Sequence, residues 1–125
     1  MKEDSVKSIR AFIGAKDFEL SKAFYHSLGF EEVMIGEKMS LFHKGEQVSF
    51  YLQDYYVEEW VNNTMLFLEV NSAEEFREEL LSKNLSETYR EIRISSIVNQ
   101  EWGNEFFLHD PSGVLWHIGD FFDFK

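Results

Sequence analysis

The stretch that decides the fold is QEWGNEFFLHDPSGVLWHI, residues 100–118 of a chain of 125. Two largely apolar segments flank Asp110-Pro111-Ser112-Gly113. Asp suits the first position of a tight turn, the fixed φ of Pro suits the second, and Gly ends the turn. We therefore predict strands at 105–109 and 114–121, joined as a β-hairpin.

Length and composition indicate a single globular domain over residues 1–125. The chain is 44% hydrophobic and contains 13 Phe, 5 Tyr and 3 Trp, so we expect some aromatic surface to line a pocket or an interface. No apolar run is long enough to span a bilayer, and no apolar leader is seen near Met1. The lack of Cys excludes a disulfide scaffold and a thiolate metal site. We expect a cytoplasmic protein.

The charge of the chain narrows the class of its partners. The formal net charge is −11 and the pI is near 4.7, which argues against nucleic acid as a partner, because that needs a basic face. A negative field speeds the approach of a cationic ligand. Solubility alone is the other interpretation, since many cytosolic proteins are acidic. Neither nucleic acid nor a membrane is an expected partner.

The first half of the chain predicts one strand, one helix and three further strands. The strands are expected at 8–15, 32–36, 39–43 and 47–54, and the helix at 18–28. Asp17 caps the helix, and Leu20, Phe24 and Leu28 form its apolar stripe. Gly29 follows as a residue that can take a positive φ.

The second half repeats this order, with strands at 64–71, 91–98, 105–109 and 114–121. Ser72 and Glu75 form a capping box for a helix that runs to about residue 83, with Phe76 and Leu80 on its apolar face. The fold class is therefore α+β. We predict two βαβββ modules, 8–54 and 64–121, that form one curled mixed sheet with helices on its outer face.

Strand alternation sorts side chains between the helix-covered face of this sheet and an open cup. A strand that offers Met, Phe and Glu on its non-core face indicates a lined groove, although a dimer interface or a partly covered surface fits equally. The residues predicted to face the cup are Ser49, Tyr51, Gln53, Met65, Phe67 and Glu69.

The βαβββ repeat, the segments 16–17 and 23–30 (KD and AFYHSLGF) and the Asp-Pro-Ser-Gly hairpin resemble the glyoxalase/bleomycin resistance protein/dioxygenase superfamily, also called vicinal oxygen chelate. The resemblance covers residues 8–121. The tail is most similar to that of bleomycin resistance proteins, Trp-Gly-x-Glu-Phe-x-Leu-x-Asp-Pro-x-Gly-x-x-x-His, which runs here from Trp102 to His117.

Enzymes of this superfamily hold a divalent metal with four cup-facing side chains. The resemblance places Arg10, Tyr51, Met65 and His117 at those positions. Arg has no acceptor, and Met and neutral Tyr are poor ligands for Mg, Mn or Fe(II). We therefore expect no metal, no cofactor and no catalytic residue, and binding rather than metal-assisted catalysis. His117 is either a structural residue of the cup wall or a ligand contact.

The resemblance implies a metal-independent homodimer, with or without strands exchanged between subunits, that confers antibiotic resistance. It would sequester a cationic or planar aromatic ligand, such as a glycopeptide antibiotic, in an aromatic groove at the dimer interface. Aromatic faces stack on flat rings and attract cations. The predicted ligand-binding residues are Trp102, Phe67, Tyr51, Glu69, Met39, Gln53, Gly113 and His117.

Several alternatives stay open at this point. The chain could be a metal-dependent lyase, isomerase or dioxygenase of the same superfamily, or a noncatalytic metabolite-binding, carrier or immunity module. Trp102 could be a core residue. Met39 lies where the family has an aromatic wall, and Phe67 and Glu69 lie where it tends to have two Trp, which leaves ligands other than bleomycin open.

Overall fold

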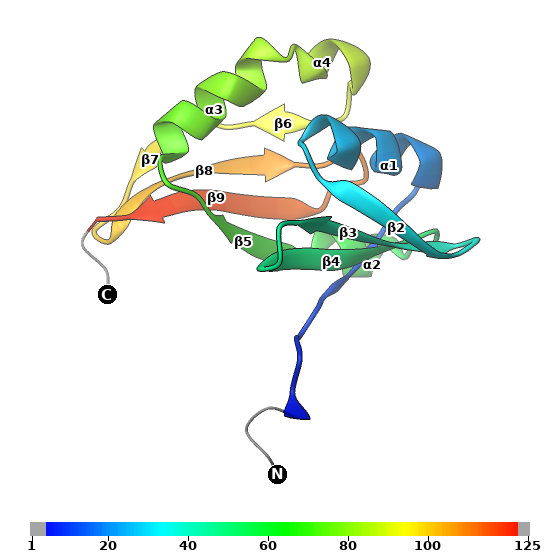
Figure 1. Cartoon of the computed structure of the whole chain (residues 1–125). Helices are drawn as coiled ribbons and strands as arrows, with labels where there is room; N and C mark the ends of the chain where they lie inside the picture. Colours follow the sequence, from blue (N-terminus) through cyan, green and yellow to red (C-terminus); the bar gives the residue numbers. More distant parts are fainter. Residues whose placement is uncertain (1–4, 123–125) are drawn as a thin grey trace.

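Each half of the chain builds one mixed sheet, and Figure 1 shows the helices α1, α3 and α4 on one side of the two sheets. The computed structural model describes residues 5–122, so the region near Met1 lies outside the described residues. None of the helices within this range is long and apolar enough to cross a bilayer. The face of each sheet that these helices do not cover is called its open face below.

The first module contains β1, α1, β2, β3 and β4, and its sheet has the order β1-β4-β3-β2. The second module contains β5, α3, α4 and β6 to β9, and its sheet has the order β5-β9-β8-β6, with β7 also paired to β8. The short helix α2 connects the modules. The bounds are β1 Phe12–Gly14, α1 Phe18–Ser27, β2 Glu31–Gly36, β3 Met39–Lys44, β4 Val48–Gln53, α2 Glu58–Asn62, β5 Met65–Glu69, α3 Ala73–Ser82, α4 Leu85–Thr88, β6 Arg93–Ile94, β7 Val98–Asn99, β8 Gly103–His109 and β9 Leu115–Phe121.

The topology of the two modules is the same. In each, the first strand pairs in parallel with the last strand, and the remaining pairs are antiparallel. This confirms the α+β class. The first module has the predicted βαβββ order, whereas the second has an additional helix, α4, and an additional strand, β7. The predicted single curled sheet is replaced by two separate open sheets, because no strand ladder joins the modules within residues 5–122.

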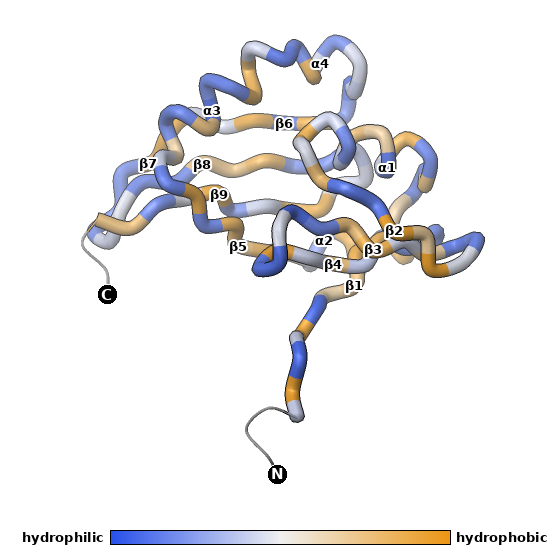
Figure 2. The backbone as a smooth tube through the Cα atoms, in the orientation of Figure 1, coloured by the Kyte–Doolittle hydropathy of each residue, from blue (hydrophilic) through white to orange (hydrophobic). Residues whose placement is uncertain are grey.

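The strand predicted over residues 8–15 is much shorter in the structure. Only β1 is a strand, although Ala11 still accepts a hydrogen bond from the Tyr51 amide at 2.9 Å. Residues 5–11 leave the body of the chain as a segment of alternating hydropathy (Figures 1 and 2). Ile9 is 97% exposed, so within residues 5–122 its side chain has no packing partner that would support a longer strand.

The strand predicted over residues 91–98 is interrupted, and it forms β6 and β7 instead. The break lies at Ser95, whose amide donates to the Phe107 carbonyl while its hydroxyl accepts from the Phe107 amide at 2.8 Å. The carbonyl of Ser95 accepts from Arg77 Nε at 2.7 Å. A side chain that replaces a backbone group in the ladder stops regular pairing, and the alternating pattern does not reveal this.

The predicted apolar stripe of α1 is partly wrong. Its buried face is made by Phe18, Ser21, Phe24 and Tyr25, whereas Leu20 is exposed. Successive residues turn by about 100° around a helix, so position 20 lies to one side of the face that contains positions 18, 21 and 25. The cap prediction is confirmed, because Asp17 accepts from the amide three residues on at 3.1 Å. Gly29 has the predicted positive φ of 96°.

A buried polar chain joins the two modules beneath α1. The indole of Trp116 donates to the Tyr25 hydroxyl at 2.8 Å, and that hydroxyl donates to Asp110 Oδ2 at 2.6 Å. The other oxygen of Asp110 accepts from the amides of the turn, Ser112, Gly113 and Val114, each at 2.9 Å. Burial, together with the Asp110 charge, raises the pKa of Tyr25 well above its usual value, so its hydroxyl stays a donor.

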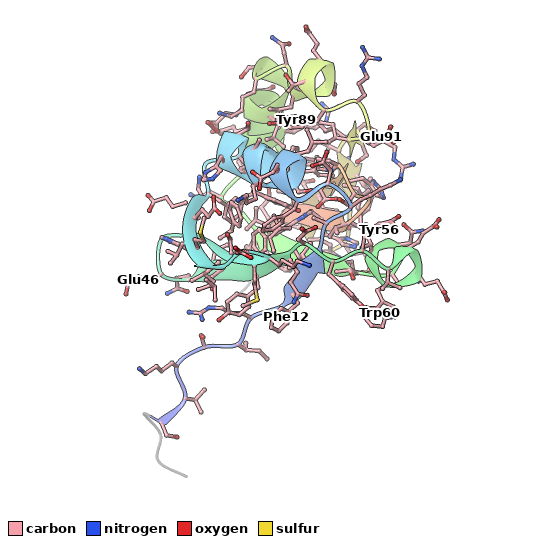
Figure 3. The ribbon with its side chains drawn as sticks, turned by 90° about the vertical axis from the view of Figure 1, so that its right-hand side faces the viewer. Phe12, Glu46, Tyr56, Trp60, Tyr89 and Glu91 are labelled. Atoms are coloured by element: carbon pink, nitrogen blue, oxygen red, sulfur yellow. The ribbon has the colours of Figure 1, made fainter. Side chains whose placement is uncertain are left out.

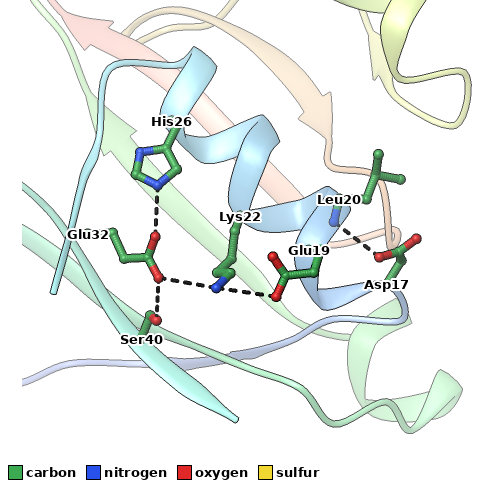
Figure 4. A network of polar contacts seen from close by, with 7 residues as sticks. All are labelled: Asp17, Glu19, Leu20, Lys22, His26, Glu32 and Ser40. Atoms are coloured by element: carbon green, nitrogen blue, oxygen red, sulfur yellow. Dashed lines mark hydrogen bonds and ion pairs between the residues drawn. The ribbon is translucent and has the colours of Figure 1, made fainter. Parts of the chain in front are cut away.

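A second, more exposed network ties α1 to β2 and β3 (Figure 4). Glu32 accepts from Ser40 Oγ at 2.6 Å, lies 2.8 Å from His26 Nε2 and pairs with Lys22 at 3.5 Å. Burial alone would raise the pKa of Glu32, but the hydrogen bonds of Ser40 and His26 and the charge of Lys22 outweigh it and lower that pKa.

Candidate ligand-binding site

The open face of the second sheet carries a cluster of aromatic side chains, which we call the aromatic wall: Phe67, Trp102, Phe107, His117 and Phe121. The ring centroids of Phe67 and Trp102 lie 5.8 Å apart, and those of Trp102 and Phe121 lie 5.0 Å apart. Phe67 is 43% exposed. The sequence therefore brings large apolar rings together on a face that its own helices do not cover.

Strand register explains why these rings meet. The parallel ladder of β5 and β9 places Phe67 beside His117, and the antiparallel ladder of β8 and β9 places Phe107 on the other side of His117. Two glycines allow the close fit. A Cβ at Gly119 would lie 3.0 Å from the Phe67 ring, and one at Gly103 would collide with the Asp120 carbonyl oxygen.

A buried carboxylate lies beneath the wall. Glu105 is 5% exposed, and its Oε1 lies 3.1 Å from His117 Nδ1 while its Oε2 accepts from Gln100 Nε2 at 3.0 Å. A carboxylate accepts hydrogen bonds, so Nδ1 is the protonated nitrogen and Nε2 of a neutral ring is an acceptor. That Nε2 is buried and has no hydrogen-bond partner within residues 5–122. An unpaired buried acceptor costs about 1–3 kcal/mol.

The open face of the first sheet has a different character. Arg10 donates to Ser49 Oγ and to the Tyr51 hydroxyl, both at 3.0 Å. The ring of Phe12 stacks on Tyr51 with centroids 5.0 Å apart. On this face the polar side chains bind the cation of Arg10, whereas on the second sheet they bind the carboxylate of Glu105.

The predicted site residues fall into two groups and one outlier. Met39, Tyr51 and Gln53 lie on the first sheet, where Met39 stands opposite Gln53 in the ladder. The wall brings Trp102, Phe67 and His117 together on the second sheet. Glu69 ends β5 and lines a cavity of about 430 Å³ between β4 and β5.

Gly113 lies apart from both groups. It belongs to the turn at one end of the β8–β9 hairpin, whereas Trp102 precedes β8 at the other end. Seven residues of extended strand separate these ends by about 20 Å, so one small ligand does not contact Gly113 and Trp102 within one chain.

The superfamily's metal positions do not fit a metal here. Arg10 and Tyr51 hydrogen-bond to each other on the first sheet, while Met65 and His117 lie on the second. Among residues 5–122, no group of three or more His, Asp or Glu side chains converges. A guanidinium, a phenol and a thioether are unsuitable donors for a hard divalent cation, so no chemical step is assigned to a metal.

Sequence reasoning missed four residues of this site, which are Gln100, Glu105, Phe107 and Phe121. A signal was present, because residues 105 and 107 alternate along one strand and residues 117 and 121 along the next. Using it requires the hairpin register, in which Phe107 stands opposite His117.

Comparison with solved structures places the fold. A bleomycin-binding protein complexed with bleomycin superposes with a TM-score of 0.75 at 23% identity, over 92% of this chain and 98% of that chain. TnmS3, an antibiotic binding protein from Streptomyces sp. CB03234, gives 0.74 at 18% identity, over 94% and 98% of the two chains. The chain has the fold of the glyoxalase/bleomycin resistance superfamily.

Lactoylglutathione lyase from Agrobacterium tumefaciens has this fold as well, with a TM-score of 0.65 at 16% identity over 94% of this chain and 96% of that chain. The resemblance seen in the tail is thus confirmed at the level of the fold. Neither a protein-family model nor a curated protein sequence matches the chain. Because antibiotic binders and an enzyme share the fold, the choice between binding and catalysis depends on the side chains.

Proposed function

We propose that this protein binds a planar aromatic or cationic antibiotic-like molecule against the aromatic wall, without a metal ion. The observation that carries the proposal is the partly exposed cluster of Phe67 and Trp102 above the Glu105–His117 pair. Flat rings stack on such a wall, and the carboxylate beneath it favours a cation. Two antibiotic binders of the same fold support this choice.

The unpaired nitrogen of His117 gives the ligand a further role. A ligand N–H that reaches Nε2 would satisfy a buried acceptor that has no partner among residues 5–122. The Phe67 ring lies nearly parallel to the imidazole, at an interplanar angle of 19° with the ring centroids 6.4 Å apart. The acceptor therefore selects amines and amides over hydrocarbons.

We also propose that the groove is completed by a second copy of the chain. Ile9 and Phe12 are exposed, as is Trp60 at 64%, and Figure 3 shows Phe12 and Trp60 at the edge from which the N-terminal segment departs. Exposed apolar surface of this kind favours association. The open face of the partner's first sheet would then bring Tyr51, Met39 and Gln53 opposite the wall.

Calorimetric titration with metal-free bleomycin, with and without EDTA, tests the binding proposal. We expect saturable binding that EDTA leaves unchanged. Trp102→Ala and Phe67→Ala should each weaken it more than tenfold, because a stacked ring contributes about 0.5–1.5 kcal/mol beyond its buried area. Leu81→Ala is the matched control, since Leu81 is 44% exposed and lies on α3.

Unchanged affinity in both wall variants, or binding that disappears with EDTA, would contradict the proposal. If bleomycin itself fails to bind, a thermal-shift screen of related glycopeptides and planar cationic dyes extends the test, because a ligand of the folded state raises the melting temperature. His117→Asn separates the roles of the ring nitrogens. It retains a donor for Glu105 and removes the Nε2 acceptor, so affinity for ligands with an N–H should fall selectively.

Sedimentation analysis tests the second copy. We expect a species of twice the 14.8 kDa chain mass, and we expect Ile9→Asp to shift it toward the monomer. Leu81→Asp places the same charge on an exposed apolar position outside the open faces and should leave the mass unchanged. A monomeric wild-type protein that still binds bleomycin would show that one chain suffices.

A further inference from the structure

A second cavity, of about 630 Å³, lies at the turn end of the β8–β9 hairpin, where both modules contribute to its walls. The first module supplies the residues that precede and begin α1, and the segment between β4 and α2 supplies Tyr56. The second module supplies the segment before β6 and the Asp-Pro-Ser-Gly turn. The residues that matter here are Lys16, Tyr56, Arg90, Arg93, Ser112 and Gly113.

The charge of this cavity is opposite to that of the chain as a whole. The sequence has 12 Lys and Arg against 23 Asp and Glu, yet three basic residues line this one cavity. Within residues 5–122, Lys16, Arg90 and Arg93 form no salt bridge, although Lys22 pairs with both Glu19 and Glu32. Three basic side chains that are not held in salt bridges remain available to a bound anion.

Two carboxylates, Asp17 and Glu91, also line the cavity, so its formal charge is +1. Asp17 accepts from the Leu20 amide as the cap of α1, and within residues 5–122 neither carboxylate forms a salt bridge with these cations. Burial and then the charge of Arg93 lower the pKa of the neighbouring His109.

Hydrogen bonds hold the backbone at Lys16 and at the turn on this side of the cavity. The Lys16 amide donates to Ser112 Oγ at 2.9 Å, and the same oxygen lies 3.3 Å from Ser21 Oγ. The turn itself is held by the buried carboxylate of Asp110. Figure 3 shows Tyr56 and Glu91 on the same face of the molecule, and both line the cavity.

We propose that this cavity binds a small organic phosphate. The guanidinium groups of Arg90 and Arg93 and the ammonium of Lys16 suit the oxygens of a phosphate monoester. The ring of Tyr56, whose centroid lies 5.7 Å from Lys16 Nζ, packs against the organic part. Gly113, in the turn beside the cavity, lies about 20 Å, the length of a seven-residue strand, from Trp102 of the aromatic wall, whereas Arg93 also lines another cavity together with Phe107 of that wall.

Amide chemical shifts and calorimetry with adenosine 5′-monophosphate, inorganic phosphate and adenosine test this proposal at constant ionic strength. We expect the monophosphate to bind more tightly than phosphate, and adenosine not to bind. The amides of Lys16 and Gly113 should shift on binding, while those of Gly103 and Phe121 should not. Loss of bleomycin binding would leave this result unaffected.

Variants locate the contacts. Arg90→Gln and Arg93→Gln should each weaken the monophosphate about tenfold or more, as expected for the loss of a charge-assisted hydrogen bond. Lys83→Gln removes an exposed positive charge after α3 and is the matched control. Tyr56→Leu should weaken the monophosphate and leave inorganic phosphate unchanged.

Three results would overturn the proposal. The first is a monophosphate titration without saturable shifts at Lys16 and Gly113. The second is equal weakening by Lys83→Gln and Arg93→Gln, which would indicate unspecific attraction. The third is equal affinity for phosphate and the monophosphate, which would exclude the Tyr56 contact.

Discussion

The closing hairpins of the two modules, β3–β4 and β8–β9, share a topology and differ in what their turns contact. The turn of the first is exposed: Gly45 has open space around it, and Figure 3 shows Glu46 pointing into solvent. The turn of the second is built on Asp110, which is fully buried and bonded to Tyr25 of α1. The sequence motif therefore marks the hairpin that locks the modules together.

The open faces show the same relation. Phe12 stands beside Tyr51 in the parallel ladder of the first sheet, and Phe67 stands beside His117 in that of the second. Behind the tyrosine lies the cation of Arg10, whereas behind the histidine lies the carboxylate of Glu105. Both modules therefore have an aromatic pair at the same position of the parallel ladder, but the charged side chain that contacts the pair is a cation in the first module and a carboxylate in the second. A groove made from one face of each kind would have a basic wall and an acidic wall.

Replacing the buried carboxylate of Asp110 should have the largest effect on stability, because only the second turn depends on such a group. In Asp110→Ala, the hydroxyl of Tyr25 and three turn amides lose their acceptor. We expect the free energy of unfolding to fall by about 3 kcal/mol or more, since hydrogen bonds to a charged group contribute about 1.5–3 kcal/mol each. Urea unfolding measures this change.

The matched control is Glu46→Ala, in the turn of the other hairpin, which should change stability by less than about 0.5 kcal/mol. Tyr25→Phe should have an intermediate effect, because it removes one donor and leaves the amides bonded. Similar losses in Asp110→Ala and Glu46→Ala would mean that the buried turn does not join the modules.

A smaller effect is expected where the second sheet supports the aromatic wall. A Cβ at Gly103 would collide with the Asp120 carbonyl, whereas a Cβ at Gly36, in the first sheet, meets nothing within 4 Å. We expect Gly103→Ala to cost about 1–3 kcal/mol through backbone displacement. Gly36→Ala should be neutral or stabilising by up to about 1 kcal/mol.

Near-ultraviolet circular dichroism adds a second measurement, because the packing of Trp102 against Phe121 depends on the close approach of β8 and β9. The signal should change in Gly103→Ala and stay the same in Gly36→Ala. An unchanged spectrum and an unchanged free energy of unfolding in Gly103→Ala would show that β8 and β9 can move apart without loss of stability.

Local signals predicted most of the fold. Helix caps at Asp17 and Ser72 fixed two helix starts, and period-two alternation found the long strands. The errors share one cause, which is that tertiary contacts decided the outcome. Residues 8–11 have a strand pattern, but within residues 5–122 they form no regular ladder beyond the bond from the Tyr51 amide to Ala11, and Ser95 interrupts a strand through a side-chain bond to Phe107. The short helices α2 and α4 have too few residues to show a helical period.

The candidate site was predictable only in part, because tertiary contacts also decided which of its residues meet. Alternation placed Phe67 on the open face, and the resemblance of the tail singled out Trp102 and His117. Glu105 stood in that tail without a role, because its contact with His117 depends on the β8–β9 register. The sequence did not predict that the site residues divide between two sheets, because strand patterns do not indicate whether the two modules pair with each other.

The smallest expected effect distinguishes how each module holds its helix. Glu32 ties α1 to the first sheet, and its pKa is lowered, so this tie stabilises the fold above the unfolded pKa of Glu, about 4.3, and is lost as the pH falls through the lower folded pKa. Glu32→Gln should therefore cost about 1 kcal/mol at pH 7 and almost nothing at the most acidic pH where the protein stays folded. Arg77 ties α3 to the Ser95 carbonyl at 2.7 Å, a contact in which no carboxylate takes part. Urea unfolding between pH 3 and 7 should give a constant cost for Arg77→Gln and a cost for Glu32→Gln that falls to almost nothing at low pH; parallel costs would show that Glu32 acts through packing rather than charge.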